Sequence, residues 1–269
     1  MGEVDREMQT RNLIALAKSP DGFKFTNTFF PYTSGEIGPY YVQSGGVLHE
    51  GKAYAQACKD MTELVVRSFG GVPPKDLVIS GGESRDWMFS APVAERLELP
   101  YAKIYKDGKI VGASMKDRTV AHVADLNNEG SSPRDLWVPV IKREGGNPQT
   151  ITFFVDRLED GVGVMQELGL RSNAVIPLDE YAWGVLQKEG IITPDAYNSL
   201  RKRMENKDIW AHAMLRNRNG LETLAALLAS GKTREKGQKI LNIGYPDLKD
   251  ELVEALKKQI GFGITRWLK

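Results

Sequence analysis

Hydrophobic positions in roughly the first two thirds of the chain form two alternating kinds of segment. Short apolar runs bounded by glycine or polar residues are typical of buried strands. Apolar residues three and four positions apart predict helices over 52–69, 84–97 and 159–168. Strands that alternate with helices predict an α/β fold with a mostly parallel central sheet flanked by helices. The expected strands are 76–80, 119–124, 149–155 and 172–176.

After about residue 190 the strand pattern stops. Segments 194–204, 208–229 and 245–260 all have helical periodicity. We therefore expect an α/β domain over 1–190 and an all-helical C-terminal extension over 191–269.

Composition and charge exclude several classes of protein. The 269 residues carry 36 Lys+Arg and 35 Asp+Glu, a net charge of +1, with 41% hydrophobic and 26% charged residues. This balance is typical of a globular chain and argues against disorder. No apolar run approaches the roughly 20 residues that span a bilayer, so no membrane association is expected. The single cysteine, Cys58, excludes an internal disulfide and a cysteine-based zinc site, and favours a reducing, cytoplasmic location.

Three expected strands end in polar turns. Ligands bind at the carboxyl ends of strands in parallel sheets, so each turn is a candidate site. Gly81 and Gly82 allow close backbone approach in the first turn. The second turn, 124–132, holds an acid, a glycine and serines before a helix, a pattern suited to phosphate. In the third turn, Arg157 is suited to a carboxylate or phosphate.

Each turn also has a purely structural interpretation. The glycines are compatible with an ordinary turn, the polar residues of 127–132 with a helix cap, and Arg157 with an ion pair. His49, His122 and His212 are scattered and predict no zinc site, and His122 fits a buried, hydrogen-bonded strand residue better than a catalyst. The basic run 201–203 fits a solvated face, and nucleic-acid binding is not expected.

Taken together and in order, these segments resemble the type I phosphoribosyltransferases, and among them the orotate phosphoribosyltransferases. The resemblance covers about residues 20–190. The segments that carry it are 33–41, 78–83, 99–112, 120–132 and 155–161.

The resemblance implies a fold, a reaction and a set of site residues. The fold is the phosphoribosyltransferase fold, and the reaction transfers phosphoribosyl from phosphoribosyl pyrophosphate to a pyrimidine-type base such as orotate. Mg²⁺ is the implied cofactor, held through the pyrophosphate rather than directly by side chains, and a homodimer is the implied assembly. The implied catalytic residues are Asp125, which binds the ribose hydroxyls, and the loop lysines Lys106 and Lys109. The implied substrate-binding residues are Gly81 and Gly82 for pyrophosphate, Asn128, Gly130, Ser131 and Ser132 for the 5-phosphate, Arg157 for the base carboxylate, and Tyr40 and Tyr41 beside the base.

The chain departs from the family pattern mainly by losing charge. Ala124 stands where the family has the first of two acids, Glu129 where it has a hydroxyl residue, and Tyr105 where it has an arginine. Thr33 replaces a lysine and Val111 a histidine. These departures favour a second hypothesis, a catalytically silent protein of this fold that binds or senses a nucleotide or phosphate ligand. A third hypothesis is an assembly protein that acts through its helical extension.

Overall fold

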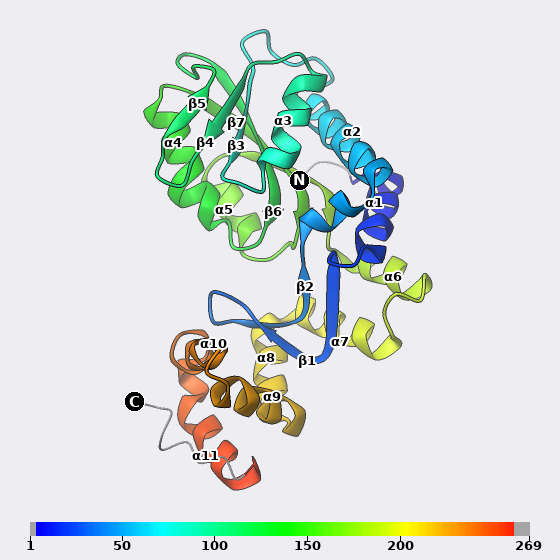
Figure 1. Cartoon of the computed structure of the whole chain (residues 1–269), viewed down its shortest axis with the longest axis vertical. Coiled ribbons are helices and arrows are strands. Elements are labelled where there is room, and N and C mark those ends of the chain that lie inside the picture. The colour runs from blue at the N-terminus through cyan, green and yellow to red at the C-terminus, as the bar shows by residue number, and fades with distance from the viewer. Residues whose placement is uncertain (1–3, 261–269) are drawn as a thin grey trace. The chain divides into compact units, whose positions relative to one another are not determined.

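A computed structural model describes residues 4–260, including the side chains of 4–258, and the chain forms two compact units (Figure 1). The first unit contains the chain up to Gly22 together with Gln43–Leu186. The second contains Phe23–Val42 and the chain from Gln187 onward. The segment 23–42, which lies inside the expected 1–190 domain, therefore groups with the C-terminal helices.

A six-stranded sheet forms the centre of the first unit, in the order β5-β4-β3-β6-β7-β8. Every neighbouring pair is parallel except β4 with β5, so the predicted mostly parallel α/β sheet is confirmed. The four expected strands are β3, β6, β7 and β8. The short strands β4 and β5 carry too few residues to give a periodic signal. The strands are β3 (Val78–Gly82), β4 (Tyr101–Ile104), β5 (Ile110–Gly112), β6 (Thr119–Asn127), β7 (Asn147–Asp156) and β8 (Arg171–Pro177).

Helices cover both faces of this sheet (Figure 1). On one face, Val140 and Met165 pack with Phe153 of β7 in a buried cluster. On the other face, Phe89 stacks on Phe154 with ring centroids 4.6 Å apart. Alternate residues of one strand thus fill both cores, which explains the continuous apolar runs in the sequence. The helices are α1 (Arg6–Lys18), α2 (Gly51–Ser68), α3 (Trp87–Arg96), α4 (Val138–Arg143), α5 (Gly161–Glu167) and α6 (Glu180–Lys188), with a π-helical stretch at Pro133–Trp137 and a 3₁₀ turn at Ser44–His49.

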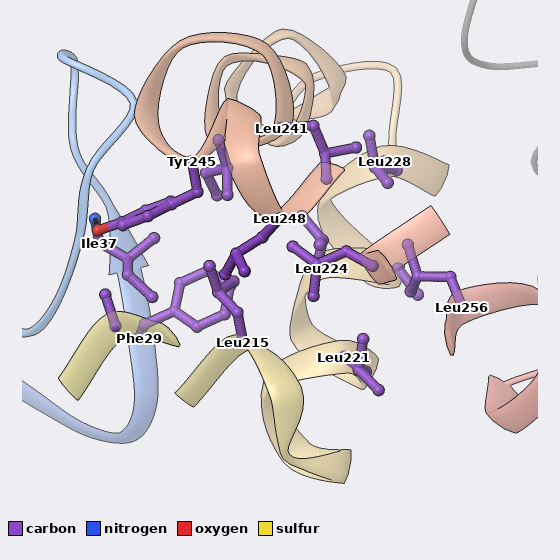
Figure 2. Close-up of a cluster of buried hydrophobic side chains, with 14 of the residues drawn as sticks. Phe29, Ile37, Leu215, Leu221, Leu224, Leu228, Leu241, Tyr245, Leu248 and Leu256 are labelled. Carbon is purple, nitrogen blue, oxygen red and sulfur yellow. Dashed lines mark hydrogen bonds between the residues drawn. The ribbon is translucent and has the colours of Figure 1, made fainter. Parts of the chain in front are cut away.

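The second unit is an antiparallel hairpin packed against helices. Phe29 and Ile37 of the hairpin lie among leucines from the helices (Figure 2). The backbone N–H of Ile37 donates to the Tyr245 hydroxyl at 3.2 Å. A two-stranded hairpin alone is marginal in water, so the helices stabilise it. The elements are β1 (Phe23–Pro31), β2 (Ile37–Val42), α7 (Pro194–Glu205), α8 (Lys207–Arg216), α9 (Arg218–Ala229), α10 (Arg234–Lys239) and α11 (Lys249–Ile260), with a π-helical stretch at Ile240–Gly244 and a 3₁₀ turn at Pro246–Leu248.

The predicted helical C-terminal stretch is confirmed, with one internal difference. The segment 208–229, expected as a single helix, forms α8 and α9 with a break at Asn217. Asn217 has an extended backbone (ψ 159°), and its side chain accepts a hydrogen bond from the Gly220 N–H. This N-cap begins a second helix, and it interrupts a hydrophobic period that continues across the break.

The leucine cluster of the second unit gives a test of its stability. Leu224 is fully buried, and we expect Leu224→Ala to lower the free energy of unfolding by about 2–5 kcal/mol, because it removes apolar contacts and leaves a cavity. Leu227 lies in the same helix but is only partly buried, so Leu227→Ala is the matched control and should cost clearly less. Equal losses for the two variants in urea denaturation would contradict this packing.

Candidate functional site

The three polar turns lie at one edge of the sheet of the first unit. They follow β3, β6 and β7, which are parallel neighbours, so their carboxyl ends meet at the same edge. The chain passes from β3 to β4 on one side and later from β6 to β7 on the other. The gap between β3 and β6 is therefore the point where strand order reverses, the usual ligand position in open α/β sheets.

Strands β3 and β6 separate at this point. Their register ends at Ser80 opposite His122, whereas β3 continues beside β4 to Gly82 and β6 continues beside β7 to Asn127. Past the last pair, backbone groups of the two strands no longer bond to each other. Side chains must supply these hydrogen bonds.

Asp86 supplies two of the missing hydrogen bonds. Its Oδ2 accepts from the Gly82 N–H and its Oδ1 from the Asp125 N–H, both at 2.9 Å. Asp86 is the N-cap residue of α3, yet its side chain makes no capping bond to that helix. The carboxylate instead joins the ends of β3 and β6.

A histidine and a tryptophan lie beside this carboxylate. Nε2 of His122 is 3.5 Å from Oδ2 of Asp86, and Nδ1 of His122 is hydrogen-bonded to the Ser80 hydroxyl at 2.9 Å. The imidazole stacks on Trp137 with ring centroids 4.4 Å apart. His122 is buried, as expected, but its Nε2 has no hydrogen-bond partner in the part of the chain that the structure describes.

Asp125 lies near the end of β6 and is buried beside Asp86. Its Oδ2 accepts a hydrogen bond from the Ser44 hydroxyl at 2.6 Å. The neighbouring Ala124 faces the opposite way, into the core cluster with Phe153. The position where the family has its first acid is thus part of the apolar core here.

Burial sets the protonation of this cluster. Desolvation raises the pKa of Asp86 to about 7. Desolvation, together with the charge of Asp86, also raises the pKa of Asp125 to about 7. Desolvation lowers the pKa of His122 to about 3. At neutral pH the imidazole is therefore uncharged, while the two carboxyl groups titrate.

The turn after β6 leads into a helix start. Gly130 has φ +70°, and a Cβ there would come 2.8 Å from Cβ of Val164, so the position requires glycine. Ser131 and Ser132 are exposed at the first turn of the helix. Exposed hydroxyls beside the N–H groups of a helix start suit an anion.

The turns after β6 and β7 are tied together. The Arg157 N–H donates to the Asn127 carbonyl at 3.1 Å, and the Gly161 N–H donates to the Asn128 carbonyl at 3.0 Å. The Asn127 amide nitrogen donates to Oδ1 of Asp156 at 3.2 Å. Oδ1 of Asn127 and Oδ1 of Asn128 are buried without a hydrogen-bond partner among residues 4–258.

In the β3 turn, the backbone N–H groups of Gly82 and Glu83 are hydrogen-bonded within the protein, whereas an open anion-binding loop leaves such groups to the ligand. The Gly82 N–H is bonded to Asp86, and the Glu83 N–H donates to the Ile104 carbonyl at 2.8 Å. The Gly81 carbonyl accepts from the indole N–H of Trp87 at 3.0 Å. Ser84 and Arg85 follow in exposed positions, and the charge of Arg85 acts to lower the pKa of Asp125.

Lys106 and Lys109 lie on the exposed turn between β4 and β5. The Lys106 N–H donates to Oε2 of Glu83 at 2.9 Å, and Nζ of Lys109 is 5.9 Å from the ring centroid of Tyr105. The chain then returns to β6 over residues 113–118, where Met115 is 2% exposed and belongs to the core. This connection is anchored in the core.

Arg157 and the two tyrosines occupy different units. Arg157 is buried in the first unit, with Nη2 2.9 Å from Oε1 of Glu159. Tyr40 and Tyr41 belong to β2 of the second unit. Tyr40 is buried and Tyr41 is 38% exposed.

Two searches of the described residues bear on metals and membranes. Within residues 4–258, no three His, Cys, Asp or Glu side chains gather in a group able to hold a metal ion. In the same part of the chain, no helix has the length and apolar character needed to cross a membrane.

Ser44, Asp86 and the partners of His122 were not identified from the sequence. Asp86 before a helix fits an ordinary N-cap, and the Asp86–Asp125 contact joins residues on different strands. The one available signal was a histidine inside an apolar strand, because a buried polar residue requires partners.

Comparison with known proteins identifies the fold. No protein-family model and no curated protein sequence matches the chain. Among solved structures, the UMP synthase of Leishmania donovani has a TM-score of 0.61 at 19% identity over 72% of this chain, which spans only 41% of that protein. Orotate phosphoribosyltransferase from Aeropyrum pernix has a TM-score of 0.55 at 20% identity, covering 66% of this chain and 99% of its own. The Francisella tularensis orotate phosphoribosyltransferase has a TM-score of 0.57 at 19% identity, covering 71% and 96%. The chain therefore has the phosphoribosyltransferase fold expected from its motifs.

The raised carboxyl pKa values predict how stability depends on pH. Asp86 and Asp125 have pKa values of about 7 when folded against a reference of 3.8, so the folded state holds extra protons between these values. The free energy of unfolding should therefore fall as pH rises through this range, by up to about 1.4 kcal/mol per pH unit for each proton. His122 has the opposite effect: because its pKa is lowered from 6.5 to about 3, it makes the free energy of unfolding rise with pH between these two values.

Asp86→Asn removes one of the two carboxyl groups that make the free energy of unfolding fall as pH rises. The contributions of Asp125 and His122 that remain have opposite signs. We expect a clearly flatter pH profile for this variant in denaturant titrations from about pH 5 to 8. Asp107→Asn, on the exposed β4–β5 turn, is the control and should keep the wild-type profile. An unchanged slope in Asp86→Asn would contradict the protonation described here.

Proposed function

We propose that the first unit binds a phosphorylated ribose compound, either phosphoribosyl pyrophosphate or a nucleotide, at the carboxyl edge of its sheet. The observation that carries this proposal is that one strand, β6, leads from a carboxylate at Asp125 into a glycine-serine helix start at 130–132. A carboxylate binds hydroxyls and a helix start binds phosphate, so the two ends of ribose 5-phosphate find complementary groups on one strand and the turn that follows it.

Asp125 has the chemistry of a hydroxyl-binding residue. Its Oδ2 already accepts a short 2.6 Å hydrogen bond from the Ser44 hydroxyl. A carboxylate has further acceptor sites on its two oxygens, and ribose hydroxyls are donors of the same kind. We assign the ribose to Asp125 and the 5-phosphate to Gly130, Ser131 and Ser132, with Asn128 beside them.

Phosphoribosyl transfer to a pyrimidine-type base such as orotate is the second candidate function. It is supported by the fold shared with orotate phosphoribosyltransferases and by the family motifs in the sequence. In this candidate, Asp125, Lys106 and Lys109 act in catalysis and Gly81 and Gly82 approach the pyrophosphate. Arg157 binds the base carboxylate.

Mg²⁺ belongs to this second candidate. Its ligands would be mainly pyrophosphate oxygens, and when bound it would stabilise the charge on the leaving pyrophosphate. In this candidate Asp125 would orient the ribose, and the Ser44 hydroxyl donates to its Oδ2. We also propose a homodimer for this candidate, which analytical ultracentrifugation of the full chain tests.

Several contacts favour binding without turnover. The Gly82 and Glu83 amides are used inside the protein, Arg157 is paired with Glu159, and the connection after β5 is anchored by Met115. Transfer depends on cations and donors that act in the transition state, so their use elsewhere weakens catalysis more than binding.

The phosphate assignment predicts the effect of removing two hydroxyls. Ser131→Ala with Ser132→Ala should weaken binding of ribose 5-phosphate about tenfold in calorimetry, because charge-assisted hydrogen bonds to the phosphate are lost. Ser114→Ala, an exposed serine on the connection before β6, is the control and should bind as the wild type does. Equal binding by the double variant would contradict this placement.

A turnover assay separates the two candidate functions. Incubation of the full chain with phosphoribosyl pyrophosphate, Mg²⁺ and orotate should release no pyrophosphate above the uncatalysed rate if the site only binds. Release that depends on orotate and is lost in Arg157→Ala would instead establish transfer. Asp160→Ala, an exposed neighbour in the same turn, is the control for a general effect on that turn.

A further inference from the structure

The carboxylate of Asp86 occupies a position suited to an anionic ligand. It accepts hydrogen bonds from the N–H groups of Gly82 and Asp125, at the ends of β3 and β6 where the strand order reverses. Converging backbone N–H groups at such a point are a natural site for an anion. Here the anion is supplied by the chain itself, and Asp86 is 3% exposed.

The nearby groups do not neutralise this carboxylate. Nε2 of His122 lies 3.5 Å away, but the lowered pKa of about 3 leaves the imidazole uncharged at neutral pH. The loop 82–86 and the end of β6 carry Glu83, Asp86 and Asp125 against one guanidinium, that of Arg85. At pH 7.5, above the pKa of about 7 of both carboxyl groups, a second anionic group brought to this side meets like charge and finds its backbone donors already bonded.

The other side of the site is open to an anion. Ser131 and Ser132 are exposed at a helix start that follows Gly130, and their hydroxyls are donors suited to a phosphate. The site is therefore asymmetric, with one side prepared for a phosphate and the other filled by Asp86.

We propose that Asp86 is a built-in anion that limits the site to ligands with a single phosphate, on the side of Gly130–Ser132. The ligand class is ribose 5-phosphate or a nucleoside monophosphate, rather than a ribose that also carries a diphosphate. This inference rests on the proposed binding of a phosphorylated ribose compound and states which member of that class the site takes.

The wild-type chain tests the inference without any substitution. Calorimetry of the full chain at pH 7.5 with ribose 5-phosphate, and separately with phosphoribosyl pyrophosphate and Mg²⁺, compares two ligands that differ by the diphosphate. We expect the wild type to bind ribose 5-phosphate at least as tightly as the diphosphate compound. A wild type that binds phosphoribosyl pyrophosphate tenfold more tightly would overturn the inference while leaving the proposed function standing.

Substitution of Asp86 should reverse the preference. Asp86→Ala frees both backbone donors and removes one negative charge, so binding of phosphoribosyl pyrophosphate should tighten about tenfold, equivalent to about 1.4 kcal/mol. Binding of ribose 5-phosphate should not tighten, since its phosphate lies on the other side and its ribose still depends on Asp125, so the ratio of the two affinities should shift toward phosphoribosyl pyrophosphate. Asp86→Asn keeps the side-chain volume and removes the charge, and should show a smaller gain in the same direction.

Asp76→Ala is the matched control. Oδ2 of Asp76 accepts from the backbone N–H of Thr119 at 2.8 Å, so it bridges the starts of the same two strands at the opposite edge of the sheet. The control should leave the ratio of the two affinities unchanged, and circular dichroism verifies that each variant is folded. An equal shift of the ratio in Asp76→Ala would overturn the inference. Absence of binding by both ligands to the wild type and to every folded Asp86 variant would overturn the proposed function and this inference with it.

Discussion

The hydrogen bonds that Asp86 accepts from Gly82 and Asp125 hold together the part of the sheet on which the candidate site depends. The backbone ladder between β3 and β6 ends at Ser80 and His122, and beyond it each strand pairs with its other neighbour. Two backbone donors would otherwise face a buried gap, which is energetically costly. One carboxylate satisfies both and fixes the backbone of Asp125, and its charge also raises the pKa of the Asp125 carboxyl group.

The chain has a known fold, but several groups at its candidate site are bonded within the protein. The chain shares its fold with orotate phosphoribosyltransferases, but the backbone groups around its β3 turn are bonded within the protein. Arg157 is paired with Glu159 rather than lying alone in its turn. A shared fold alone therefore does not establish a shared reaction.

The sequence predicted the parts of the structure that rest on local pattern. Strands β3, β6 and β7 are mostly buried on both faces, so their apolar runs were unambiguous, and their order placed three turns at one edge. The hairpin 23–42 was not identified, because Phe23–Pro31 mixes polar and apolar residues and Phe29 becomes buried only against distant helices. The break at Asn217 was hidden by a continuous hydrophobic period. The contacts among Asp86, His122 and Asp125 depend on strand register, which no local pattern shows.

The hairpin also has a consequence for the order of events during synthesis. The residues that flank the hairpin, Gly22 and Gln43, belong to the first unit. They are joined by a hydrogen bond of 2.8 Å from the Gln43 N–H to the Gly22 carbonyl. Phe29 and Ile37, however, are buried by residues such as Leu224 and Tyr245, which a ribosome adding about 5–20 residues per second delivers roughly ten to forty seconds later. During that interval the apolar side chains of this segment are uncovered in the nascent chain, and a chaperone would be able to bind them before the C-terminal helices emerge.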